Sequence, residues 1–276
     1  MKFSASVLLA SAALGVTAHP SGHAHMHKKD FVVARKPDVV TQYVTQTAAA
    51  AAAATSTASA SSDDDSSSGY VEFCSSAASK RATTEEIAYK GNTGTASNYG
   101  CNIMTVSKSV ASKYDYTATF TNSVAKDQAC VCFNKIGPDG GINGFWKGNE
   151  AISFTLPASG SKTVAFQANS QGGCACSVGT EVATTSIGQY AATWLEFDFE
   201  NTSNNGWSGA DASCLVAAAA GLDIPALKVC FDGTCSTVNT GGTGDNAYLG
   251  GMEALDGVGL NIASGKKVAL AITVGQ

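Results

Sequence analysis

The sequence predicts an all-β fold: a disulfide-stapled, mostly antiparallel β-sandwich that follows a disordered N-terminal pro-region. Three observations predict it. Many short segments alternate apolar and polar residues and are rich in β-branched side chains, glycine-rich turns separate them, and nine cysteines accompany them. Helix signals are slight and amount to a turn or two at residues 214–220 and 251–255.

Each expected strand has the two-residue period that places alternate side chains on opposite faces of a sheet. These strands are residues 102–106, 116–122, 152–156, 163–166, 194–199, 227–231 and 267–274. Turn residues lie between them, at positions 138–141, 172–173, 205–206 and 241–242. One β-sandwich domain is therefore expected over residues 70–276.

The first 18 residues have the pattern of a signal peptide. Met1-Lys2 gives a basic start, an apolar run covers residues 5–16, and Ala18 closes a small-residue cleavage site. The apolar run is too short to span a bilayer. We therefore expect a secreted, extracellular product, released or held at the cell wall, with no membrane insertion.

Residues 19–69 have the composition of a disordered pro-region or spacer. An alanine run at 48–54 and a Ser/Thr/Ala/Asp tract at 55–69 bury too little apolar surface to offset their ordering entropy. In an exported chain such a tract is typical of an O-glycosylated spacer. The dibasic pair Lys80-Arg81 follows. It predicts either processing after Arg81 or simply two solvated charges.

Every histidine lies in this pro-region, at His19, His23, His25 and His27. The domain therefore has no imidazole base, which excludes Ser–His–Asp and Cys–His catalysis within it. The histidine tail is able to bind copper or nickel, although such tracts often bind metal incidentally. Carboxylate chemistry, or no chemistry, remains for the domain, and we expect no cofactor.

The charge of the domain argues against nucleic acid as a partner. From residue 82 onward there are ten lysines, no arginine and sixteen acidic residues, a formal charge of −6. Neutralisation of phosphates supplies most of the affinity for nucleic acids and anionic membranes. An acidic domain without arginine is therefore a poor binder of both.

In an exported chain the cysteines predict disulfides rather than a redox or zinc site. An Asp-Gly hairpin turn brings Cys230 next to Cys235, so we expect these two to be bonded. The CVC unit at 130–132 and the CAC unit at 174–176 each place two thiols on one strand face. We expect these units to cross-link each other, and a four-thiolate zinc site is the alternative.

Three cysteines remain, and their pairing involves the N-terminal region. Bonding Cys101 to Cys214 would leave Cys74 alone. Cleavage after Arg81 would remove Cys74 and leave an even set of eight, which fits processing at that site. The expected disulfide cysteines are thus Cys101, Cys130, Cys132, Cys174, Cys176, Cys214, Cys230 and Cys235.

The strand at residues 194–199 holds the best candidate for a binding site. Alternation places Leu195, Phe197 and Phe199 toward the core and the other side chains outward. An indole can cover the apolar face of a sugar ring while carboxylates accept its hydroxyl hydrogens. A solvated outer strand face is the alternative. The candidate ligand-binding residues are Trp194, Glu196, Asp198, Glu200, Trp207 and Asp211.

Hydrolysis is the catalytic alternative for this strand. Glycosidases need two carboxyl groups about 5 to 9 Å apart across a cleft, one of them with a raised pKa. Glu196 with Asp211 opposite it is the better pair, because neighbouring exposed carboxylates seldom differ enough in environment. Asn201 begins an N-glycosylation sequon in an expected surface loop, where a glycan would crowd any site.

Four ordered strings carry a family resemblance: FNKIGPDGG at 133–141, VAFQANSQG at 164–172, WLEFDF at 194–199 and GWSG at 206–209. They resemble the group-four Aspergillus secreted allergen family (Asp f four), over residues 87 to about 235. The resemblance implies a secreted fungal protein that host IgE binds in exposed people, and it implies no enzymatic activity.

A shorter resemblance concerns the fold type. Residues 194–199, followed by 209–213, are similar to a stretch of thaumatin-like proteins. This likeness implies a sandwich of the thaumatin-like type and places Glu196 and Asp211 where acidic-cleft residues lie. Such clefts are associated with β-glucan binding.

Three classes of function follow. The expected one is a secreted, non-catalytic binder of cell-wall glycan, or of a host glycan or protein. The alternatives are an acidic β-glucan hydrolase that uses Glu196 and Asp211, and a structural cell-wall protein without a discrete ligand.

Overall fold

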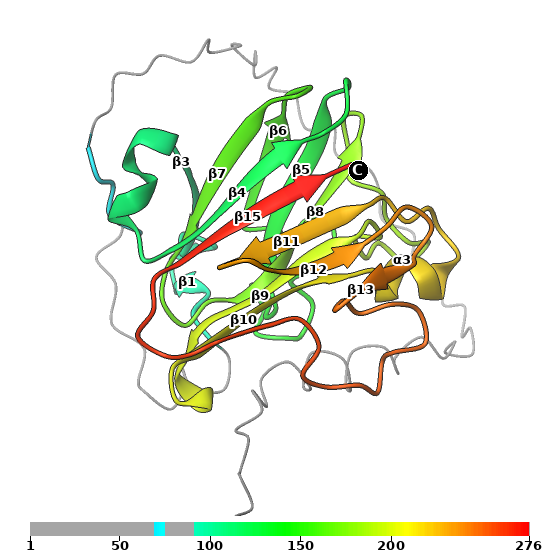
Figure 1. Cartoon of the computed structure of the whole chain (residues 1–276). Helices are drawn as coiled ribbons and strands as arrows, with labels where there is room; N and C mark the ends of the chain where they lie inside the picture. Colours follow the sequence, from blue (N-terminus) through cyan, green and yellow to red (C-terminus); the bar gives the residue numbers. More distant parts are fainter. Residues whose placement is uncertain (1–68, 75–90, 276) are drawn as a thin grey trace, which may run out of the picture.

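The computed structural model describes residues 69–74 and 91–275 (Figure 1). The predicted signal peptide, the histidine tail, the spacer and the Lys80-Arg81 pair lie outside the described residues. Within the described part, no helix is long and apolar enough to cross a membrane.

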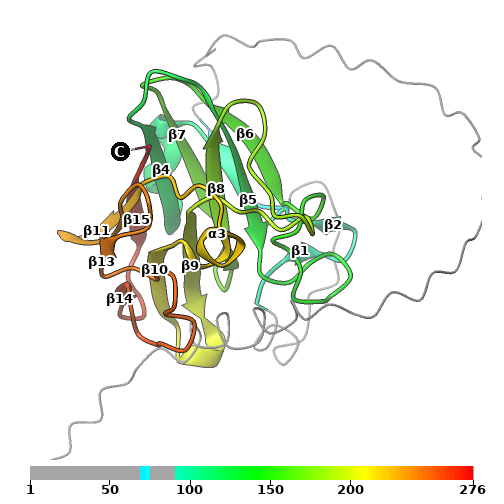
Figure 2. The same cartoon turned by 90° about the vertical axis from the view of Figure 1, so that its right-hand side faces the viewer.

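Two large sheets form most of the described part of the molecule. The view in Figure 2, turned by 90° from that of Figure 1, shows them as two layers side by side. The six-stranded sheet has the order β14 (Leu260–Ile262), β10 (Trp207–Ser213), β9 (Trp194–Asn201), β8 (Gln171–Val178), β5 (Gln128–Asn134), β6 (Ile152–Leu156). The seven-stranded sheet has the order β13 (Gly244–Asp245), β12 (Thr234–Val238), β11 (Leu227–Phe231), β15 (Val268–Val274), β4 (Tyr116–Asn122), β7 (Ser161–Phe166), β3 (Ile103–Val106).

The remaining elements are short. They are the pair β1 (Gly94–Thr95) and β2 (Asn98–Tyr99), the 3-10 helices η1 (Lys108–Lys113) and η2 (Thr202–Asn204), and the helix α3 (Leu215–Ala220). Neighbouring strands pair antiparallel except β15 with β4, which run parallel. The prediction of a mostly antiparallel, two-sheet β structure is confirmed.

The main core lies between the two sheets and follows the two-residue period of the strands. On β9 the side chains of Leu195, Phe197 and Phe199 are fully buried in this core, as predicted. Phe166 of β7, in the opposite sheet, packs on Phe197 with a ring-centroid distance of 4.5 Å. Apolar side chains of both inner faces therefore hold the layers together.

Four disulfides staple the described residues, and three of them were predicted. Cys230 is bonded to Cys235 across the β11–β12 hairpin. The two Cys-x-Cys units cross-link β5 to β8, because each cysteine lies directly opposite its partner in that strand pair. These two bridges are Cys130–Cys176 and Cys132–Cys174.

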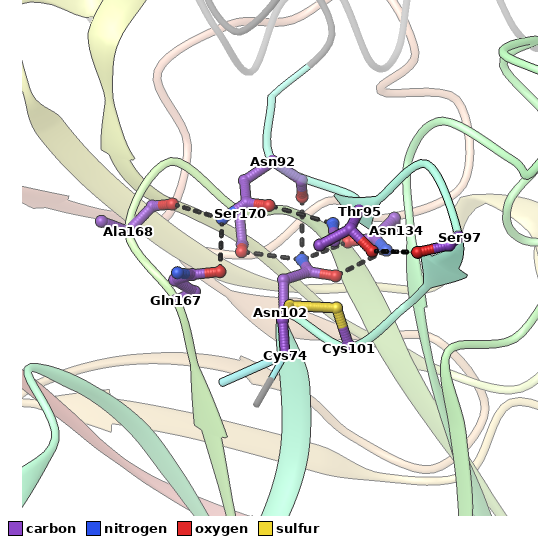
Figure 3. The surroundings of a disulfide bond; sticks show 11 residues. Cys74, Asn92, Thr95, Ser97, Cys101, Asn102, Asn134, Gln167, Ala168 and Ser170 are labelled. Atoms are coloured by element: carbon purple, nitrogen blue, oxygen red, sulfur yellow. Dashed lines mark hydrogen bonds between the residues drawn. A yellow bond between two sulfur atoms is a disulfide. The ribbon is translucent and has the colours of Figure 1, made fainter. Parts of the chain in front are cut away.

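The fourth disulfide corrects the predicted pairing of Cys101 with Cys214. Cys101 precedes the edge strand β3 and is bonded to Cys74, whereas Cys214 is a buried free thiol at the end of β10 in the other sheet. The segment around Cys74 packs beside β3, because the Phe73 and Tyr114 rings meet there. Figure 3 shows this bridge beside the buried amide of Asn102.

Close packing explains one further correction. Gly172 and Gly173 do not form the predicted turn but lie within β8. A Cβ on Gly173 would come within 2.8 Å of the Phe133 ring, so this strand position is glycine because an aromatic ring lies on it. The predicted helical turn at 214–220 is present as α3, whereas residues 251–255 are not helical.

A second, smaller core covers the outer face of the six-stranded sheet. The β5–β6 connection (135–151) and the β8–β9 connection (179–193) supply its apolar side chains, together with α3. Main-chain bonds join the two connections, from Lys147 N to Gly188 O at 2.9 Å and from Tyr190 N to Phe145 O at 3.0 Å. The outer face of this sheet is therefore covered around β8 and β9, whereas Ser153 and Thr155 of the edge strand β6 are exposed.

Candidate functional site

The outer face of β9 is buried, which corrects the prediction that it faces solvent. Trp194, Glu196 and Asp198 are 7%, 3% and 6% exposed. Trp194 packs in the second core, where its indole ring lies 5.0 Å from that of Phe133. The sequence pattern of β9 is that of a strand with one solvated face, but the two long connections cover that face.

Glu196 and Asp211 lie directly opposite each other on β9 and β10. Their Cβ atoms are therefore about 5 Å apart, the usual separation of opposed residues in an antiparallel pair. Asp211 is fully buried, and burial, followed by the charge of Glu196, raises the pKa of its carboxyl well above the ordinary value. The two carboxyl groups that the sequence placed together are thus adjacent, but they are enclosed.

Asp198 lies two residues along the same face. Its Oδ2 accepts a hydrogen bond from Asn201 Nδ2 at 2.6 Å. Burial raises the pKa of Asp198 to about 7, against the lowering effects of Asn201 and of the Lys135 charge. This carboxyl group therefore changes its charge near neutral pH.

Glu200 does not continue the acidic row, which corrects a further prediction. Its backbone has φ +49°, and the pairing of β9 with β10 shifts register between Trp207 and Gly209. The strand alternation ends at this irregularity. The carboxylate of Glu200 instead accepts a hydrogen bond at 2.8 Å from the hydroxyl of Tyr116, on β4 of the opposite sheet.

Asn201 lies inside the protein and not in a surface loop as predicted. It is fully buried, its Nδ2 donates to Asp198, and its Oδ1 accepts from the Ser203 backbone N–H at 2.8 Å. N-glycosylation joins the sugar to Nδ2. A glycan on Asn201 is therefore incompatible with this folded arrangement.

The two other tryptophans lie apart from the acidic pair. Trp207 is half-buried at the start of β10 and pairs with Asn201, so it belongs to a strand and not to the loop expected from the sequence. Trp146 is half-buried in the β5–β6 connection, where it bridges to Gln189.

An open groove lies on the outer face of β5 and β6, beside the two connections. Its volume is about 320 Å³. Lys147, Glu150, Glu181, Tyr190 and Thr155 are among the residues that line it. A ligand can reach the carboxylates of this groove, whereas it cannot reach the buried pair of Glu196 and Asp211 on β9 and β10.

The charged groups of the groove are held in place. Glu150 Oε2 accepts hydrogen bonds at 2.7 Å from both the Tyr190 hydroxyl and the Gly148 N–H. Burial opposes ionisation of Glu150, but these bonds and the Lys147 charge together lower its pKa. Lys147 also forms an ion pair with the exposed Glu181 at 2.9 Å.

Sequence reasoning missed this groove. Glu150 and Glu181 each lie alone in an irregular connection, 31 positions apart, and neither belongs to a strand or a motif. A run of alternating carboxylates on one strand was a stronger signal. No signal in one sequence shows that two long connections meet over the sheet.

Among residues 69–74 and 91–275, no cluster of three or more His, Cys, Asp or Glu side chains has the arrangement of a metal site. The cysteines of the alternative zinc site are instead bonded to each other in pairs. The predicted histidine tail lies outside the described residues.

Comparison with known proteins identifies the family. The model of the Allergen Asp f 4-like domain matches residues 101–274. Allergen Asp f 4 of Aspergillus fumigatus is 38% identical over 199 residues, which span 70% of this chain and 61%, less than two thirds, of that relative. The crystal structure of the protein elicitor MoHrip2 from Magnaporthe oryzae matches at 14% identity with a TM-score of 0.37, over 58% of this chain and 99% of that one. Because the family model covers more than half of its length, this chain belongs to the Asp f 4-like allergen family.

Proposed function

We propose that the chain is a secreted fungal protein that binds a cell-wall glycan, or a host glycan or protein, without catalysing a reaction. Four disulfides and the relationship to an allergen support export, because disulfides form and persist in oxidising compartments. Recognition by host IgE is part of the proposal, since the related Aspergillus fumigatus protein is named an allergen. The thaumatin-like type of sandwich stays a prediction from the sequence.

One observation carries the non-catalytic part of the proposal. Glu196 and Asp211, the predicted acid pair, are 3% and 0% exposed. A glycosidase places its two carboxyl groups on either side of the bond that it cleaves, so both must reach the substrate. Because the carboxyl groups of Glu196 and Asp211 are enclosed, a structural role for this pair is favoured over hydrolysis.

The open groove supports the binding part of the proposal. Hydroxyl groups of a sugar donate to carboxylates and accept from ammonium groups, and the groove offers both. Glu150 is already oriented by Tyr190 and Gly148, so binding does not have to order it. We propose this groove in place of the buried row on β9 as the surface that contacts a short glycan segment.

Glycan-array binding by the purified protein tests the proposal. We expect wild type to bind and both Glu150→Gln and Glu181→Gln to lose binding at least tenfold. Asp115→Asn is the matched control, because Asp115 is exposed and pairs with Lys267 away from the groove. Binding that survives both groove substitutions would contradict the groove as the site.

A reducing-end assay on the same glycans separates the alternatives. Release of reducing ends by wild type, abolished in Glu196→Gln, would establish the hydrolase and refute a non-catalytic function. No binding and no release would favour the structural cell-wall protein.

A further inference from the structure

The opposed pair of Glu196 and Asp211 has the geometry of two carboxyl groups that share a proton. Both side chains are buried on the same face of adjacent strands. In a medium of low dielectric constant, two carboxylates about 5 Å apart repel strongly, so one of them holds a proton well above its ordinary pKa. Burial and the charge of Glu196 raise the pKa of Asp211, as this argument requires.

The β13–β14 connection (246–259) covers this pair. Tyr248 of the connection is fully buried, and burial, followed by the charge of Asp211, raises the pKa of its phenol. At the other end of the connection, a Cβ on Gly259 would come within 2.6 Å of Asp211 Cβ. The connection therefore packs against Asp211 at Gly259 and places the Tyr248 phenol close enough for the Asp211 charge to act on it.

The ionisable groups nearest the pair are acidic or neutral. β9 contributes Glu196 itself and Asp198, two residues along the same face, and the charge of Lys135 acts on Asp198. The connection contributes Tyr248, with Asp256 acting on that phenol from further away. β8 places Gly173 opposite Glu196 and so contributes no side chain. β14 pairs with β10 through Leu260–Ile262, which bear no charge.

Hydrogen bonds join this connection to its neighbours near its two ends, where Asn246 Nδ2 also donates to Cys235 O of β12 at 3.2 Å. Tyr248 N donates to Ala212 O at 3.0 Å, and Cys214 N donates to Tyr248 O at 2.9 Å. Asn246 Oδ1 accepts from Gly259 N at 3.0 Å and so ties the two ends of the connection together. Most of the intervening residues are exposed or half-buried and belong to no strand or helix. The segment that excludes water from the pair is thus held less firmly than the strands that bear it.

We propose that Asp211, which lies opposite Glu196, holds a proton that keeps the 246–259 connection closed over β10 at acidic pH, and that the connection opens when Asp211 ionises. Two buried carboxylates need water, and opening of the connection admits it. This opening is independent of glycan binding in the groove, which lies over β5 and β6.

Amide hydrogen exchange between pH 5 and 9, corrected for the intrinsic exchange rate, tests the proposal. The reporting amides are those of Tyr248 and Cys214, which bond across the junction. Opening that releases one proton becomes about tenfold more favourable per pH unit. We therefore expect their protection in the wild type to fall about tenfold per unit above the ordinary pKa of Asp211 and to level off above its raised pKa, and to stay constant in Asp211→Asn.

Three controls make the outcome specific. The comparison is made in an Asp198→Asn background, which removes the other buried acid of this face. Glu196→Gln should reduce the pH dependence, whereas Asp115→Asn, on the surface, should leave it intact. Equal pH dependence in wild type, Asp211→Asn and Glu196→Gln would overturn the proposal.

Infrared spectroscopy gives a second measurement. In the Asp198→Asn background, where Asp198 cannot contribute, the protein should show a protonated-carboxyl band at neutral pH that Asp211→Asn removes. Absence of that band at neutral pH would refute a proton held by Asp211.

Discussion

The two faces of strand β9 are equally buried but differ in chemistry. Leu195, Phe197 and Phe199 face the core between the sheets, whereas Glu196 and Asp198 face the layer of covering connections. Burial of the first set is favourable at every pH, because it removes apolar surface from water. Burial of Asp198 depends on protonation, because burial raises its pKa and favours the neutral form. Burial alone therefore does not identify a core, because the charge state of a buried group decides what its burial contributes to stability.

Removal of an apolar side chain from the inner face should have the largest effect. Phe197→Ala leaves a cavity between Phe166 and Phe199, whose rings lie 4.5 and 5.2 Å away. We expect a loss of about 3 to 5 kcal/mol in the free energy of unfolding. Urea denaturation at pH 5 and pH 8 should give the same loss at both. A loss of unfolding free energy that differs between pH 5 and pH 8 would contradict the proposed difference between the two faces.

The outer face should respond to pH, and Asp198 gives the clearest test. Its pKa is about 7 in the folded protein and 3.8 ordinarily, so folding favours the protonated form. The stabilisation is complete below the ordinary value and is lost as pH rises toward 7. Between pH 5 and pH 7 the free energy of unfolding should fall by about 2 kcal/mol.

Asp198→Asn is the matched variant for this prediction, because it keeps an oxygen that accepts from Asn201 and removes the charge. Its stability should vary less with pH than that of wild type, by about the same 2 kcal/mol between pH 5 and pH 7. Equal pH dependence in both proteins would show that Asp198 is not the group that titrates.

Comparison with the sequence shows where strand patterns suffice and where they do not. Three disulfides and the inward set on β9 were predictable, because each depends on a two-residue period or a tight hairpin turn. The exposure of Glu196 was predicted wrongly, because the segments that cover it are irregular and far away in sequence. The partner of Cys101 was missed for the same reason, since the segment around Cys74 packs beside β3 without belonging to any strand.

Asn201, at the end of the outer face of β9, tests how much the charge of Asp198 matters. Asn201→Ala removes the hydrogen bond to Asp198 and should cost about 1 to 3 kcal/mol at pH 8, where the carboxylate is charged. The cost should be smaller at pH 5. A Ser203→Ala variant is the control, since it removes the sequon and the bond from Ser203 Oγ to Asn201 Oδ1 but keeps Asn201 and its bond to Asp198.

The same residue makes a prediction about glycosylation. The folded protein from a secreting host should carry no glycan on Asn201, so enzymatic removal of N-glycans should leave the mass of its peptide unchanged. A glycosylated Asn201 peptide from folded protein would show that the buried network at this end of β9 is incorrect.

Processing after Arg81 should have the smallest effect of all, because it changes neither face of β9. The cut would fall between Cys74 and Cys101, which are bonded to each other, so the N-terminal piece would remain attached instead of being discarded. Residues 69–74 also stay packed, since the Tyr114 hydroxyl bonds the Val71 N–H and C=O at 3.0 and 2.9 Å. Under non-reducing conditions, intact mass should therefore increase by one water on cleavage, and two chains should separate only after reduction. Loss of the N-terminal piece without reduction would contradict the Cys74–Cys101 bond and would restore the sequence-based expectation that Cys74 leaves with the pro-region.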